Sequence, residues 1–348
     1  MNHSPSSVLR HFKGVVDSTL REGFQFAGAD FSPDDQAAIF DRLVRLGVDI
    51  VEVGNPVQPE IRQRVLALSR RRGASLRPRL FAHIRNHERD VRAAAESGVD
   101  GVSILCTADR ERLAAMGLTR DSARDRLRSN IALAVSFGLE SRVGVEDFFG
   151  RSFRDCLEVY DLAAAAGAAR IALADTLGKA QAWDVARKVA ALRKRTALGI
   201  EAHFHNDLGQ AVSNAVAAVR AGANWISCSL LGIGERTGIT PLSSFLANLY
   251  VLDPAAASRY RLEELTDAEG LVSRLCGIDV PLHLITSPAN GFAHKAGIHL
   301  DALMKFGPGK YEPLPPRVVG NVRRLVLHTP ISGKTSERQA REFEQRFG

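Results

Sequence analysis

The sequence alternates short apolar runs typical of β-strands with longer segments that have the periodicity of amphipathic helices. The predicted strands are Gly14–Leu20, Val48–Val53, Leu76–Ala82, Gly101–Leu105, Glu140–Glu146, Arg170–Ala174, Ile200–His205 and Trp225–Ser229. The predicted helices are Pro33–Leu46, Pro59–Arg72, Glu88–Ser97, Thr119–Phe137, Ser152–Ala166, Ala182–Arg195, Gln210–Ala221 and Pro241–Val251. The strands are too apolar to face water on either side, so helices must cover them. Eight such units predict an α/β fold, a (β/α)8 TIM barrel.

A doubly wound open sheet is the alternative for the same alternation. It would require a glycine-rich phosphate-binding turn directly after the first strand. The chain instead reads Asp-Ser-Thr-Leu-Arg-Glu-Gly from Asp17 to Gly23. The closed barrel is therefore favoured.

The regular alternation ends near Leu252. We expect a catalytic barrel over residues 12–252 and an accessory segment over residues 253–348. The second segment contains helical pieces joined by loops rich in proline and glycine. It is expected to be an appendage of the barrel rather than an independently stable domain.

The excess of positive charge is modest, because 46 Lys and Arg residues face 39 Asp and Glu residues, a net charge of +7. The arginines are dispersed over the predicted helices and are not clustered with aromatic residues. We therefore expect no nucleic-acid partner and infer that the charge attracts small anionic substrates.

The cysteines and the N-terminus indicate a reducing, cytoplasmic environment. The four cysteines lack the spacing of a zinc knuckle or a disulfide framework: Cys106, Cys156, Cys228 and Cys276. The first residues have no apolar core of a signal peptide, and no stretch is apolar enough to span a bilayer. We expect a cytoplasmic protein without membrane contact.

Two histidines at the end of the seventh predicted strand suggest a metal site. His203 and His205 are two residues apart, so a strand places both side chains on one face. In a closed barrel only the eighth strand separates them from the first strand, which is followed by Glu22. Two imidazoles and one carboxylate leave coordination positions open for a substrate, which is typical of catalytic metal sites. The neighbouring Arg21 would place a fixed cation near a developing enolate or alkoxide, or would form an ion pair with Glu22 or Asp17.

Four ordered motifs then carry a resemblance to a known family. They are Asp17–Gly23, His203–Asp207, Gly232–Leu242 and His294–His299. Together they resemble the signatures of the metal-dependent enzymes of acyl-CoA Claisen condensation, the 2-isopropylmalate and homocitrate synthases and their lyase relatives. The run His83-Ile84-Arg85, followed by His87, is most similar to homocitrate synthases. The resemblance covers approximately residues 13–312.

The resemblance implies an acyltransferase that condenses acetyl-CoA with 2-oxoglutarate to give (R)-homocitrate and CoA. It also implies one divalent metal ion, such as Zn, Mg, Mn or Co, and a domain-swapped homodimer. Such an enzyme would serve lysine biosynthesis or the synthesis of a cofactor ligand in nitrogen fixers.

The resemblance also implies roles for individual residues. The metal ligands would be Glu22, His203 and His205, and Arg21 would polarise the ketone of the oxo acid. The oxo acid would be bound by Gln25, Glu52, His83, Arg142 and Thr176, with Arg142 at the distal carboxylate and Thr176 at the C1 carboxylate. His299 would remove the methyl proton of acetyl-CoA with the help of Tyr311, both from the partner's tail. Glu235, in the glycine-rich loop, is a further candidate catalytic residue.

Three departures from the homocitrate synthase pattern bear on the substrate. Gly144 stands where a serine helps to bind the distal carboxylate, Gly54-Asn55 replaces Thr-Ser, and Phe24 replaces a glutamate. Oxaloacetate and 3-phosphonopyruvate are therefore alternative substrates. A branched apolar oxo acid is expected to leave Arg142 unpaired, which argues against 2-isopropylmalate synthesis.

Two other function classes are less favoured. The lyases of this superfamily carry a cysteine in the glycine-rich loop, and Leu231–Gly238 contains none. A non-catalytic binding module would be expected to lose at least one of Glu22, His203, His205 or His299, and all four are present.

Overall fold

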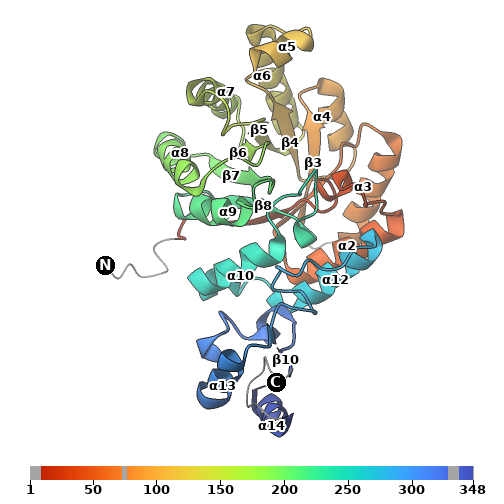
Figure 1. The fold of residues 1–348 in the computed structure, drawn as a ribbon. Helices are drawn as coiled ribbons and strands as arrows, with labels where there is room; N and C mark the ends of the chain where they lie inside the picture. Colours follow the sequence, from red (N-terminus) through yellow and green to blue (C-terminus); the bar gives the residue numbers. More distant parts are fainter. Residues whose placement is uncertain (1–8, 73–76, 328–336, 348) are drawn as a thin grey trace.

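The computed structural model describes residues 9–72, 77–327 and 337–347, which form a closed barrel with a C-terminal extension (Figure 1). The barrel strands are β1 (Gly14–Asp17), β2 (Ile50–Val53), β3 (Arg79–Arg85), β4 (Gly101–Cys106), β5 (Glu140–Val145), β6 (Arg170–Asp175), β7 (Gly199–Phe204) and β8 (Trp225–Cys228). Each strand pairs in parallel with the next, and β1 closes the barrel against β8. The predicted TIM barrel is confirmed.

Helices surround the strands at the predicted places. They are α2 (Pro33–Leu46), α3 (Pro59–Arg72), α4 (Glu88–Ala95), α6 (Arg120–Ser136), α7 (Phe153–Ala165), α8 (Ala182–Arg195), α9 (Ala211–Arg220) and α10 (Leu242–Leu252). Ser32 caps α2 by accepting a hydrogen bond from the backbone N–H of Asp35, as a capping serine before a proline predicts. The helices bury their apolar faces against the outward side chains of the strands, where Phe40 and Leu43 are completely buried.

Some boundaries differ from the prediction. The first strand ends at Asp17 rather than Leu20, because the Asp17 carboxylate and the Ser18 carbonyl accept backbone N–H groups of the following turn. The third strand begins at Arg79, and its predicted start at Leu76 lies outside the described residues. The short helix α5 (Arg110–Ala115) follows β4 and was not predicted.

The C-terminal part begins on the barrel and then leaves it. α11 (Pro254–Ala257), η3 (Leu262–Glu264) and α12 (Leu265–Cys276) come first, and α12 packs against α2. Then come β9 (Ala293–His294), α13 (Gly297–Phe306), η4 (Pro308–Lys310), η5 (Pro316–Val319), β10 (Arg324–Leu325) and α14 (Glu337–Phe347). Figure 1 shows α13 and α14 beyond α10, away from the strands of the barrel. The parallel pairing of β9 with β10 was not predicted, because two-residue strands show no periodicity.

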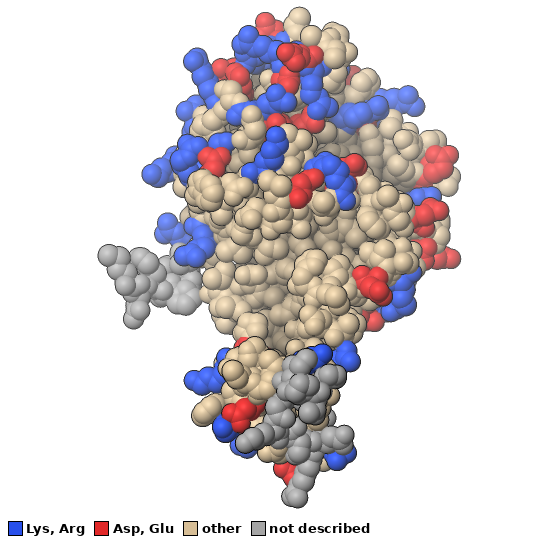
Figure 2. All heavy atoms as spheres, viewed as in Figure 1, with Lys and Arg blue, Asp and Glu red and all other residues tan. Residues whose placement is uncertain are grey.

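No helix of the described residues is both long and apolar enough to cross a membrane. The charged side chains in Figure 2 gather over α5 and α6, where Lys and Arg are interspersed with Asp and Glu. A broad band over α9 and α10 shows almost no charged side chains, and the sequence of α10 contains none.

Candidate active site

Glu22, His203 and His205 form a buried cluster at the C-terminal end of the barrel strands. Their potential ligand atoms all lie within 4.8 Å of one another. The alternation of β7 directs both imidazoles to the barrel interior, and only β8 separates β7 from β1. The sequence therefore predicted correctly that these three side chains converge.

The protonation states of the cluster suit a metal ion. Burial lowers the pKa of His203 well below its usual value and also lowers the pKa of His205. Both rings are therefore neutral at pH 7, which is the form that binds a metal. The Nδ1 atom of His205 is buried and has no hydrogen-bond partner among the described residues.

The spacing also suits a metal ion. The Nε2 atom of His205 lies 4.0 Å from Oε1 of Glu22, too far for a direct hydrogen bond. Two ligand atoms that each bind one ion at about 2.0–2.2 Å can lie up to about 4.4 Å apart. This donor set of two imidazoles and a carboxylate therefore fits a divalent cation.

Arg21 and Glu52 lie beside this cluster. The Nε atom of Arg21 donates to Oε2 of Glu52 over 2.7 Å, and Arg21 also forms an ion pair with Glu22. Glu52 accepts a second hydrogen bond from Ser18 Oγ over 2.9 Å, and its Oε1 lies 3.4 Å from His83 Nδ1. Burial alone would raise the pKa of Glu52, but the positive charges of Arg21 and Arg142 hold it well below its usual value.

Arg142 is held between two buried carboxylates. Its Nη2 atom lies 3.1 Å from Glu52 Oε1, and its Nη1 atom forms an ion pair with Glu201. Glu201 also accepts from Ser227 Oγ over 2.7 Å and lies 3.4 Å from Arg170 Nη1. The argument that an apolar oxo acid would leave Arg142 unpaired is therefore wrong, because the protein itself supplies two partners.

Glu201 was missed in the sequence analysis, although its position carried a signal. It stands two residues before His203 on the same strand, so strand alternation alone places its side chain inside the barrel. The alternation of charge continues towards the other end of the barrel, where Arg170 Nε lies 2.7 Å from Glu140. Glu140 in turn lies 2.6 Å from Arg79. A network of ion pairs, in which arginines and glutamates alternate, thus runs through the barrel from Arg21 to Arg79.

The glycine-rich loop after β8 contacts the cluster through its backbone. The N–H group of Glu235 donates to Oε1 of Glu22 over 3.2 Å, whereas the Glu235 side chain is exposed. Arg236 forms two hydrogen bonds to Asp207, of 2.7 and 2.8 Å, and a third to the Thr176 carbonyl. Arg236 and Asp207, which were not predicted as site residues, therefore tie this loop to the ends of β6 and β7.

Thr176 lies at the end of β6, as predicted. Its Oγ1 atom accepts the backbone N–H of Asp147 over 2.9 Å, so its hydroxyl hydrogen stays free to donate. Near the centre of the site, Gly144 leaves room for a side chain, since an added Cβ would lie 3.7 Å from Ala172 Cβ.

His299 and Tyr311 lie together on the C-terminal extension. Their ring centroids are 4.3 Å apart, and both side chains are exposed. Within the described part of the chain, neither ring has a hydrogen bond or ion pair with the metal-ligand cluster. One subunit therefore brings these two residues together without joining them to the other predicted site residues.

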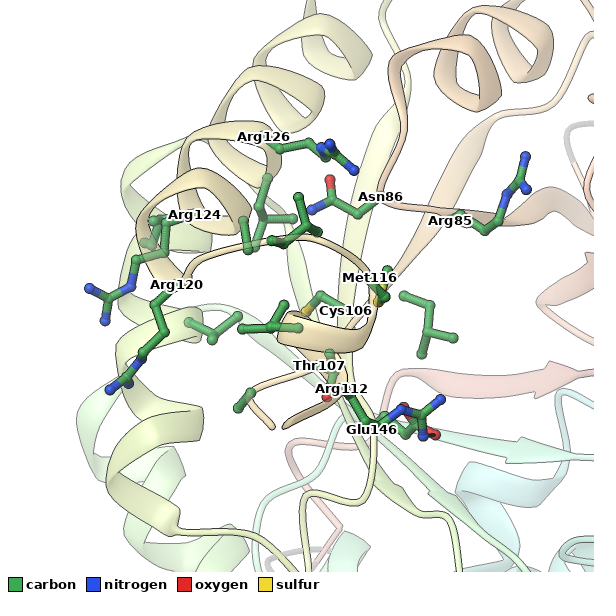
Figure 3. A pocket seen from close by; sticks show the side chains of 18 of the residues that line it. Arg85, Asn86, Cys106, Thr107, Arg112, Met116, Arg120, Arg124, Arg126 and Glu146 are labelled. Carbon is green, nitrogen blue, oxygen red and sulfur yellow. Dashed lines mark hydrogen bonds and ion pairs between the residues drawn. The ribbon is translucent and has the colours of Figure 1, made fainter. Parts of the chain in front are cut away.

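The described residues enclose two cavities, of which one borders the site. One of about 370 Å³ reaches from Arg21, Gln25 and His83 to α3. The other, of about 340 Å³, lies between the end of β4, α5, α6 and α7 and has mostly apolar walls. Figure 3 shows the second cavity, with Arg112 beside Glu146 at one rim and three arginines along α6.

Comparisons with known proteins agree with this geometry. The HMGL-like family model matches residues 14–272, and the model "Homocitrate synthase post-HMGL domain-like" matches residues 285–345. The mitochondrial homocitrate synthase of Schizosaccharomyces pombe is 37% identical, over 95% of this chain and 79% of the relative. The homocitrate synthase of Sulfolobus acidocaldarius is 32% identical, over 93% and 69% of the two chains.

A relative with a different name has a similar identity, and solved structures share the fold. The putative (R)-citramalate synthase of Methanopyrus kandleri is 33% identical, over 90% of this chain and 61% of the relative. The HMG-CoA lyase of Bacillus subtilis superposes with a TM-score of 0.70 at 19% identity, covering 78% of this chain and 96% of that structure. The barrel, the convergent metal ligands and both family matches lead to one conclusion: the chain belongs to the HMGL-like family and carries the C-terminal domain type of homocitrate synthases.

Proposed function

We propose that this protein is a homocitrate synthase, an acyltransferase that condenses acetyl-CoA with 2-oxoglutarate to give homocitrate and CoA. The observation that carries the proposal is the convergence of Glu22, His203 and His205, with Arg21 in contact with Glu22. The homocitrate synthase relatives support the reaction. One water molecule is consumed, because the thioester of the condensation product is hydrolysed to release CoA.

The HMGL-like family depends on a divalent metal, and Glu22, His203 and His205 would hold it here. When bound, such an ion would supply Lewis acidity to the ketone of a 2-oxo acid. The fixed guanidinium of Arg21 stabilises negative charge on the ketone oxygen. The free hydroxyl hydrogen of Thr176 is available to the C1 carboxylate.

The charges inside the barrel favour a dianionic substrate. Three arginines and three glutamates balance one another in this network: Arg21, Arg142 and Arg170, and Glu22, Glu52 and Glu201. A divalent cation would add two positive charges to a region from which water is largely excluded. A 2-oxo dicarboxylate restores neutrality, which an apolar monocarboxylate cannot do.

His299 acts as the base and Tyr311 assists it, both supplied by the tail of a second subunit. This part of the proposal rests on the closeness of the two rings and on their exposure. The uncharged band over α9 and α10 in Figure 2 suits an interface between two copies. In this proposal the accessory segment begins near residue 253, and the part that reaches the partner comes after α12, because α12 packs against α2 of its own chain.

The identity of the oxo acid and the cellular location need their own tests. Oxaloacetate and 3-phosphonopyruvate also carry a distal anion, and one relative of similar identity is named as a citramalate synthase. We propose a cytoplasmic location, although the relatives include cytosolic and mitochondrial isozymes. The lyase alternative stays disfavoured, because no cysteine lies in the loop Leu231–Gly238.

The direct test is thiol release from acetyl-CoA with a panel of 2-oxo acids. We expect release with 2-oxoglutarate in the presence of a divalent metal and its loss on adding EDTA, because the ketone then lacks its Lewis acid. Release with oxaloacetate or 3-phosphonopyruvate but not with 2-oxoglutarate would overturn the homocitrate assignment and keep the condensation chemistry. No release with any acid would overturn both.

Co-expression of two inactive variants tests the shared site. Glu22→Ala and His299→Ala should each be inactive alone, since one lacks a metal ligand and the other lacks the base. If the base comes from the partner, each mixed dimer has one intact site, and random pairing restores about a quarter of the wild-type activity. Co-expression of the wild-type chain with the Glu22→Ala/His299→Ala double variant is the control, because its mixed dimers have no intact site if the base comes from the partner and one intact site if it does not. Failure of the two single variants to complement would show that the base acts within its own chain.

A further inference from the structure

The cavity beside the oxo-acid site is bounded by residues that depart from the homocitrate synthase pattern. Arg21, Gln25 and His83, all expected to contact the oxo acid, form one side of this 370 Å³ cavity. Phe24 and Gly54, two positions at which the sequence differs from that pattern, also line it. The departures therefore fall together in space, next to the place where the substrate is expected.

These two departures change the cavity in definite ways. Phe24 presents an aromatic side chain where the pattern has a carboxylate, and it packs edge-on against Phe31 with centroids 5.1 Å apart. A Cβ built on Gly54 would contact Ile61 at 3.4 Å from its Cγ2, so a larger side chain at this position would take up part of the cavity. The rest of the wall is largely apolar and comes from Leu20, Val53, Val65 and Leu68. The described residues that line the cavity include no carboxylate.

A cation borders the same cavity on α3. Arg64 is half-buried there and, among the described residues, has no hydrogen bond or ion pair. Arg62, two residues earlier on the helix, is in contrast bound to Glu96 over 2.8 Å. Arg142, the residue first expected to bind the distal carboxylate, already has Glu52 and Glu201 as partners. Arg64 is thus the arginine of this region with a guanidinium left for an anion.

From this arrangement we infer that the cavity between η1 (Gly23–Gln25) and α3 accepts the tail of 2-oxo dicarboxylic acids longer than 2-oxoglutarate, with the distal carboxylate bound by Arg64. This inference rests on the proposed function. A cavity with mostly apolar walls, lined also by the oxo-acid residues and by Arg64, which is unpaired among the described residues, matches a methylene chain that ends in a carboxylate. Each methylene that leaves water is expected to tighten binding about fourfold, provided that the walls contact it.

The test compares 2-oxoglutarate, 2-oxoadipate and 2-oxopimelate in thiol release and in calorimetric binding to the Mn²⁺-loaded protein. In Arg64→Ala, kcat/KM for 2-oxoadipate relative to 2-oxoglutarate should fall about tenfold or more, because a charge-assisted contact is lost. Phe24→Glu should produce the same shift by placing a carboxylate in the cavity. Gly54→Thr should exclude the longest acid by filling space, since the backbone there does not need glycine.

Arg70→Ala is the matched control, because Arg70 lies on the same helix, is exposed and does not line the cavity. It should leave the selectivity among the acids within twofold of the wild type. Turnover of 2-oxoglutarate alone by the wild type would overturn this inference and leave the proposed function intact. Turnover of 2-oxoadipate with a selectivity that Arg64→Ala leaves unchanged would do the same. A rise in KM for acetyl-CoA alone in Arg64→Ala would overturn it too, by assigning the cavity to the thioester. Absence of turnover with every acid would overturn the proposed function itself.

Discussion

Glu22→Ala is expected to remove the bound divalent metal and to lower kcat/KM by roughly a thousandfold, since Lewis-acid stabilisation is worth several kcal/mol. Glu22 is the only carboxylate in the three-residue cluster found in the described part of the chain, so the two imidazoles would be left without an anionic partner. The loss should appear in metal content after dialysis, measured by atomic emission, before any activity is considered.

Glu60→Ala is a suitable control for this substitution, because Glu60 is exposed in the first turn of α3. That variant should keep its metal content and its activity. The conservative Glu22→Gln variant keeps an oxygen that can accept the Glu235 N–H, so its fold should stay intact while its metal affinity falls. A Glu22→Ala protein with one metal ion per subunit would contradict the ligand assignment.

Arg142→Ala is expected to lower the free energy of unfolding by about 3–5 kcal/mol, the usual cost of removing one partner from a buried ion pair. Glu52 and Glu201 are both completely buried, and Arg142 lies between them. Without that guanidinium the two carboxylates lose their common counter-ion and repel each other. Urea denaturation should show the change as a lower midpoint.

A double variant separates this charge effect from a simple loss of packing. Arg142→Ala combined with Glu201→Gln should cost less than the sum of the two single changes, because the second change removes one of the unpaired charges. Arg154→Ala, at a position that is 89% exposed, should change stability by less than about 0.5 kcal/mol. If Arg142→Ala is as stable as Arg154→Ala, the interior ion pairs do not contribute as described.

The sequence was sufficient to predict the barrel and the convergence of Glu22, His203 and His205, because both follow from strand order and residue spacing. The alternation of strands and helices places the strand ends at one rim, and the two-residue spacing of His203 and His205 directs both inward. The position of Glu22 beside these histidines could be predicted because only β8 separates β1 from β7 in a closed barrel. These inferences need only chain order and residue spacing.

Other features depend on contacts that spacing does not encode. The pairing of Arg142 with Glu201 joins residues 59 positions apart, and nothing in either strand alone indicates that partner. The bidentate contact of Arg236 with Asp207 likewise joins two loops that follow different strands. The roles of His299 and Tyr311 stay predictions, since a site shared between subunits lies beyond what one chain can place.

The network of ion pairs inside the barrel also restricts which substitutions the sequences of such proteins can accept. A single substitution at Arg142 or Glu201 produces a protein with an unpaired charge in its interior. Selection for folding would remove such a variant. Paired replacements of opposite sign avoid that intermediate. Phe24, Gly54 and Arg64 line the cavity outside this network of ion pairs, so substitutions there can alter the cavity without leaving a buried charge unpaired.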